Sequence, residues 1–116
     1  MINRAAIILK YTNEAVDWIN RADPCYDDPG MTVEGVNKDR TVYLISDEDA
    51  EDQDAAERWI SDNYLELFER ELGSWYTAVD SWPNDRSREV FNRWFRIELH
   101  AVIEDTVGTA IIDEEI

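Results

Sequence analysis

The sequence has little of several residue types on which common protein chemistry depends. Its 116 residues include one cysteine, one histidine, four glycines and three prolines. A single cysteine excludes a disulfide within the chain, and a structural zinc site needs about four Cys or His ligands in a recognisable spacing. The glycines are scattered and form no phosphate-binding loop, and the motifs of Rossmann turns, serine hydrolases and zinc proteases are absent. We therefore expect no metal site and no cofactor.

Long hydrophobic runs are also missing. The run Ala5 to Leu9 is far shorter than the roughly 20 apolar residues that cross a bilayer. It is also too short for the core of a secretory signal peptide, and only Arg4 is basic before it. With the single cysteine, these features predict a cytoplasmic protein in a reducing compartment.

Basic residues are scarce. Lysine and arginine number 11 against 27 aspartates and glutamates, which gives a net charge of −16. A phosphate backbone and an anionic membrane surface would both repel such a chain. We expect neither direct nucleic-acid binding nor membrane binding.

The excess of acid is concentrated in one segment. Residues 47–71 hold eleven acids and two bases, a net charge of −9. The acids at its start are Asp47, Glu48, Asp49, Glu51, Asp52 and Asp54. They favour a protein partner with a basic surface, and imitation of nucleic acid would be one version of this. A solvated first turn of a helix, where carboxylates complement the helix dipole, accounts for the same residues.

Hydrophobic periodicity and punctuation predict an α+β domain. The expected strands are 5–9, 41–45 and 109–112, and the expected helices are 14–22, a short turn at 32–36, a long region from 46 with a break near 61–63, and 85–107. The order is β-α-β-α-α-β, with a small sheet of about three strands covered by three or four helices. The length and the lack of a linker predict one domain over residues 1–116.

Residues 95–103 have two competing patterns. The apolar positions follow helical spacing from Val90 onward, yet 95–103 also alternates as a strand would. We favour the helix because caps stand at both ends. On that helix Glu98 lies in the apolar stripe, and a buried carboxylate near Trp94 and His100 would be a candidate ligand pocket. Structural pairing with an Arg, Tyr or Trp is the alternative for Glu98, and an exposed surface residue is the alternative for His100.

The aromatic residues are numerous and are not all placed in helices. The stretch 73–83 joins two expected helices and contains Trp75, Tyr76 and Trp82. Aromatics on a connection beside arginines are typical of an interface hot spot. The alternative is that Trp75 and Trp82 fill the gap between the two helices, since large aromatics are rarely left exposed.

Cys25 is a poor candidate nucleophile. Asp23, Asp27 and Asp28 stand beside it, and neighbouring carboxylates raise the pKa of a thiol. Pairing with His100 for thiol catalysis is therefore disfavoured.

Two segments carry a family resemblance. Thr41-Val42-Tyr43-Leu44-Ile45 followed by acids, and the run Phe91 to His100, resemble small acidic bacterial proteins with no assigned function. The resemblance covers roughly the last three quarters of the chain. It implies no activity, but it directs attention to the segment with Trp94, Phe95, Glu98 and His100.

Three hypotheses follow. The leading one is a non-enzymatic binding or regulatory module that uses the acidic segment, with the aromatic connection as a second anchor. The rival is a small-ligand-binding protein or enzyme with a pocket around Glu98. The third is a homodimer whose interface buries the surplus aromatics.

Overall fold

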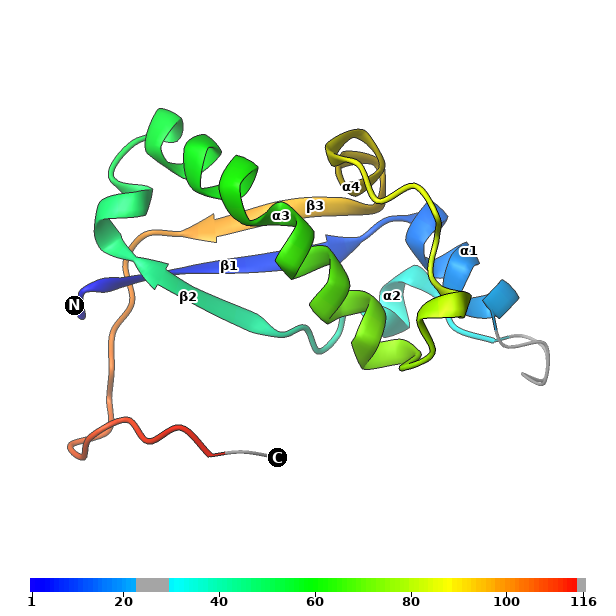
Figure 1. The fold of residues 1–116 in the computed structure, drawn as a ribbon. Helices are drawn as coiled ribbons and strands as arrows, with labels where there is room; N and C mark the ends of the chain where they lie inside the picture. The colour runs from blue at the N-terminus through cyan, green and yellow to red at the C-terminus, as the bar shows by residue number, and fades with distance from the viewer. Residues whose placement is uncertain (23–29, 115–116) are drawn as a thin grey trace.

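The computed structural model describes residues 1–22 and 30–114 and has the α+β architecture that the sequence predicts (Figure 1). Three antiparallel strands form one sheet in the order β2-β1-β3. The elements along the chain are β1 (Arg4–Tyr11), α1 (Asn13–Ala22), α2 (Val33–Val36), β2 (Val42–Ser46), the 3₁₀ turn η1 (Asp47–Ala50), α3 (Gln53–Trp75), the 3₁₀ turn η2 (Val79–Ser81), α4 (Arg88–Trp94) and β3 (Phe95–His100).

The central strand β1 organises the core. Its odd-numbered side chains Ala5, Ile7 and Leu9 are at most 1% exposed, and they point to the face that α3 covers. The largest fully buried side chains are Phe68, Phe91, Ile7, Leu9, Ile19 and Leu72, contributed by helices and β1 together. One hydrophobic cluster therefore joins the sheet to its helical layer.

The preference for a helix over residues 95–103 was wrong. Helix α4 ends at Trp94, and Phe95–His100 form strand β3, antiparallel to β1 from Tyr11↔Phe95 to Ala6↔His100. Alternation decides the outcome: Phe95 enters the core at 4% exposure while Arg96 remains exposed. Strand pairing along six residues outweighs the weaker helical spacing.

The third strand of the sheet is thus not the predicted 109–112. Residues 109–112 have no strand or helix assignment and lie in a C-terminal segment, residues 101–114, that follows β3. Ile111 and Ile112 are 72% and 76% exposed. A short β-forming run without a neighbouring strand gains no ladder hydrogen bonds.

The long acidic region divides differently from the prediction. Ser46 caps η1 rather than α3, and Asp52 caps α3, where its Oδ1 accepts a hydrogen bond from the Ala55 N–H at 2.7 Å. Helix α3 then continues to Trp75 without the expected break at 61–63. The Asn63 side chain donates back to the Trp59 carbonyl at 2.8 Å instead of capping a new helix.

Gly30, which lies between α1 and α2, has a backbone conformation that favours glycine. Gly30 has φ +73, and a Cβ built there would lie 2.8 Å from the Asn20 Oδ1 atom, which itself accepts the Met31 N–H. The predicted turn at 32–36 is α2, capped by Thr32. Cys25 lies outside the described residues. No helix in the described ranges has the length and hydropathy to cross a membrane.

Candidate functional site

The acidic residues predicted to bind a partner gather at one end of the molecule, on η1 and the start of α3. Most of them are exposed, and only Asp49 is half-buried. Within the described residues, no cation lies at ion-pair distance from any of the six. The six residues are Asp47, Glu48, Asp49, Glu51, Asp52 and Asp54. The first ion pair further along α3 is Glu57 with Arg88, at 3.0 Å.

Backbone contacts hold this acidic end in place. The Asp47 N–H donates to the carbonyl of Asn3, the residue before β1, and the Ser46 hydroxyl accepts the Glu48 N–H. A hollow of about 630 Å³ lies beside it. Its lining consists of η1 residues, Met1 and the start of the C-terminal segment: Asp47, Glu48, Ala50, Glu51, Ala101 and Val102. Met1 and Val102 are 73% and 65% exposed, so apolar surface adjoins the carboxylates.

The aromatic connection is half-buried and hydrogen-bonded. Trp75 Nε1 donates to the Tyr11 hydroxyl at 2.9 Å, and Trp82 Nε1 donates to the Tyr76 carbonyl at 2.8 Å. The Tyr76 ring also packs edge-on against Trp18 at 5.3 Å. All three predicted aromatics therefore pack between α3 and its neighbours, which is the gap-filling alternative, with part of each ring left accessible.

The expected buried Glu98 is exposed. It points to the face of β3 opposite the core, its side chain is 48% exposed, and its Oε2 lies 3.2 Å from His100 Nε2. Trp94 is 5% exposed and packs against Trp18 and Phe68 in the core. The structure thus joins Glu98 to His100 but separates both from Trp94. The cause is the strand, which turns successive side chains to opposite faces.

A buried carboxylate does exist, at Glu71 on α3. Its side chain is 4% exposed. Tyr11 and Arg40 donate to Oε1 at 2.8 and 3.1 Å, and the Tyr43 hydroxyl donates to Oε2. The Arg40 guanidinium also lies over the Tyr11 ring, 4.5 Å from its centroid. Side chains from β1 and from residues 40–43 thus converge on this one group of α3.

The surroundings of Glu71 raise the pKa values of the two tyrosines that bind it. Burial, reinforced by the Glu71 charge and hydrogen bond, raises the pKa of Tyr11 well above its ordinary value of about 10. Burial and the hydrogen bond to Glu71 raise the pKa of Tyr43 in the same way. Both phenols stay protonated and act as donors to the carboxylate across the ordinary pH range. Because both Glu71 oxygens are engaged, the arrangement fits a structural hydrogen-bonded ion pair better than a catalytic base.

The sequence did contain a signal for Glu71. It stands between Phe68, Leu72 and Trp75, at helical spacing within an apolar stripe. That is the same signal that directed attention to Glu98. Helical spacing correctly indicates a buried carboxylate at Glu71 because α3 is a helix throughout. It misleads at Glu98 because that segment is a strand.

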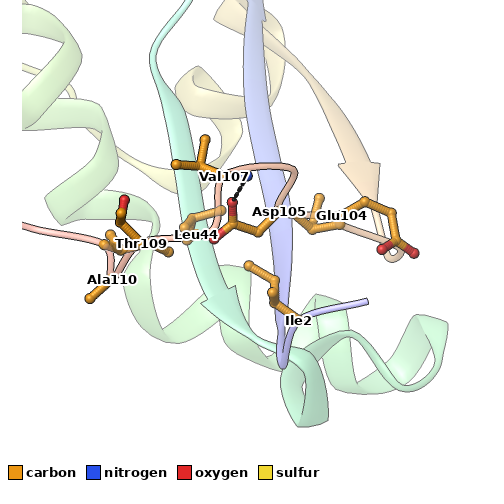
Figure 2. Close-up of a pocket in the computed structure, with 9 residues that line it drawn as sticks. Ile2, Leu44, Glu104, Asp105, Val107, Thr109 and Ala110 are labelled. Carbon is orange, nitrogen blue, oxygen red and sulfur yellow. Dashed lines mark hydrogen bonds between the residues drawn. The ribbon is translucent and has the colours of Figure 1, made fainter.

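The C-terminal segment forms an arch beside β2 (Figure 2). The Ile2 N–H donates to the Ile103 carbonyl at 2.8 Å, and Asp105 Oδ1 accepts the Val107 N–H at 2.8 Å, which turns the chain. The arch leaves a largely apolar cavity of about 360 Å³. The cavity is lined by Ile2, Leu44, Ile103, Glu104, Asp105, Val107, Thr109, Ala110 and Ile111.

Metal-binding geometry is not found in the part of the chain that the structure describes, where no three His, Cys, Asp or Glu side chains are grouped to hold an ion. Comparison with known proteins finds no matching family model, curated protein or solved structure.

Proposed function

We propose that the protein is a non-enzymatic binding module whose acidic end docks on a basic surface of a protein partner. The observation that supports it most directly is the state of the six carboxylates from Asp47 to Asp54. They are not neutralised by cations within the described residues, and they sit on a backbone fixed by two caps and by a hydrogen bond to Asn3.

A fixed frame matters for such binding. Ordering of loose side chains and loops opposes association, so charges that are already held on η1 and α3 need less ordering. A cluster of like charge also raises the rate of encounter with an oppositely charged partner. The acidic end therefore meets both requirements of an electrostatic docking surface.

The hollow beside the acids indicates the partner's chemistry. Met1 and Val102 expose apolar surface next to Asp47 and Glu51. Lysine and arginine have apolar stems below their charged groups, and such side chains cover apolar surface while they pair with carboxylates. A partner with a basic, arginine-rich patch is the best fit.

The test is affinity capture from a lysate of the source organism, with bound proteins identified after washes at low and at high salt. The wild type is compared with a variant in which Asp47, Glu48, Asp49 and Glu51 become the matching amides. Asp52 is retained because it caps α3. We expect a basic protein that is captured by the wild type and is lost both at high salt and with the variant.

A charge-matched control makes the result specific. Four exposed acids elsewhere, Asp17, Glu34, Asp39 and Asp62, are changed to amides instead. The control has the same net charge as the variant, so it should still capture the partner. Equal loss in both proteins would mean that overall charge matters and the acidic end does not.

A further inference from the structure

The sheet face opposite α3 is apolar along its middle and carries cations toward the two ends of its central strand, β1. Strand alternation places Ile8, Val42 and Leu44 on this open face, and Val42 and Leu44 are 53% and 49% exposed. The ionisable residues that share it are Arg4, Lys10, Arg96, Glu98 and His100. On the strands themselves, three cations stand against one carboxylate, in a chain whose net charge is −16.

Two of these cations face each other. Lys10 and Arg96 are directly opposite across β1 and β3, an arrangement that is unfavourable for like charges. They line a pocket of about 310 Å³ that also contains Asn13 and Asn37 and has no carboxylate in its lining. Neither cation has an ion-pair partner within the described ranges. A carboxylate placed between them would relieve the repulsion.

The C-terminal segment carries apolar residues followed by acids, which complement the apolar and basic parts of the open sheet face. Val107, Ile111 and Ile112 are 64%, 72% and 76% exposed. The acids Asp113 and Glu114 follow directly. A segment that is first apolar and then acidic matches a face that is apolar along Leu44 and Val42 and then basic at Lys10 and Arg96.

The segment is also long enough. Fully extended at about 3.3 Å per residue, Asp105 to Glu114 span about 30 Å, whereas Arg4 to Lys10 along β1 span about 20 Å. The apolar pair and the acids can therefore reach the far end of an open face together.

We infer that two copies of the chain associate by laying the C-terminal segment of each across the open sheet face of the other. The start of the segment is held against the residues that precede β1, where the Ile2 N–H donates to the Ile103 carbonyl. The Met1 ammonium pairs with Glu104 at 2.8 Å, and Asp105 turns the chain at Val107. Beyond that turn the segment passes beside β2 (Figure 1), where it shares the cavity of about 360 Å³ with Leu44. Val42, Lys10 and Arg96 do not line that cavity, so the segment leaves this part of its own open face uncovered. Reciprocal exchange covers both faces at once and forms a closed two-fold pair.

The first test measures mass by sedimentation velocity over a wide range of protein concentration. Wild type is compared with a chain that ends at Glu104, which lacks the exposed segment but keeps every strand and helix and the hollow beside η1. We expect wild type to approach the mass of a dimer as concentration rises, and the shortened chain to stay monomeric. A dimer that survives the truncation would overturn the inference, because the interface would then lie elsewhere.

The second test uses a labelled peptide of residues 105–116 added to the shortened chain. We expect binding that weakens by about tenfold when Lys10 and Arg96 are both changed to Gln, or when Leu44 is changed to Asp. Arg58→Gln, an exposed cation on α3, is the control and should leave binding unchanged. Circular dichroism checks that each variant is folded.

Two outcomes would contradict the exchange. Peptide binding together with a monomeric wild type would mean that the segment closes over its own sheet. No peptide binding would mean that the open face does not recognise the segment at all. Neither outcome affects the proposed acidic docking end, which both proteins retain.

Discussion

At the scale of single residues, Glu71 determines how α3 is fixed to the sheet. Donors from β1, β2 and the residue Arg40 between α2 and β2 meet on its two oxygens. Removal of one partner from a buried charged network leaves the others unpaired, which costs far more than the loss of a surface pair. The cluster therefore links three parts of the chain that are distant in sequence: β1, residues 40–43 and α3.

We predict that Glu71→Gln lowers the free energy of unfolding by about 3 kcal/mol, because Arg40 loses its counter-charge in a mostly buried setting. Urea denaturation measures the change. Glu66→Gln is the matched control on the same helix. Glu66 pairs with Arg70 at 3.2 Å on an exposed surface, so its loss should change stability by no more than about 0.5 kcal/mol. Equal changes in the free energy of unfolding for the two variants would show that the burial of Glu71 does not contribute to stability.

The two tyrosines predict a dependence on alkaline pH. Their pKa values are raised in the folded state. Above about pH 10 the unfolded chain releases these protons while the folded chain keeps them, so stability falls as pH rises. The slope should be about 1.4 kcal/mol per pH unit for each tyrosine, and none of this loss should occur below the unfolded pKa.

Denaturant titrations on both sides of that pH measure the slope. Tyr11→Phe and Tyr43→Phe should each remove one tyrosine's share of it, although each variant is less stable at neutral pH. A stability that does not change with pH in this range would show that the phenols are not held protonated by the fold.

At the scale of elements, α3 depends on its cap at Asp52. We predict that Asp52→Ala lowers the free energy of unfolding by about 1 kcal/mol, because the Ala55 N–H loses its acceptor. Gln53→Ala, at the exposed first position of α3, should be close to neutral. If the two substitutions cost the same, α3 is held by its packing alone.

The elements also show how far the sequence alone could be interpreted. The strands at 5–9 and 41–45, the turn capped by Thr32 and the α+β class were predicted correctly, because each has a strong local pattern or cap. The segment after Trp94 was not, because its spacing fits a helix and a strand alike. Only pairing with β1, contributed from the other end of the chain, decides between them.

The candidate site, like the fold, was predicted only where the signal lies within one short segment. The acidic run is local, so its position on a helix start could be inferred from composition. The Glu71 cluster joins residues up to 60 positions apart, from Tyr11 to Glu71, and no local pattern indicates such a meeting. Glu98 was misplaced for the same reason that β3 was.

At the scale of the whole molecule, charge is distributed unevenly. The unpaired acids lie at the end formed by η1 and the start of α3, whereas Arg4, Lys10 and Arg96 lie on the sheet face that α3 does not cover. A partner with a basic surface should therefore approach one end of the molecule rather than bind everywhere on an acidic surface.

The most direct test of the proposed function is the association rate constant with the captured partner, measured at several ionic strengths. We predict a rate constant for the wild type that falls steeply as salt is added. The dependence should be much weaker for the variant with amides at positions 47, 48, 49 and 51, and should be retained by the charge-matched control. A rate constant that is insensitive to salt, or that is the same in variant and control, would contradict binding through the acidic end.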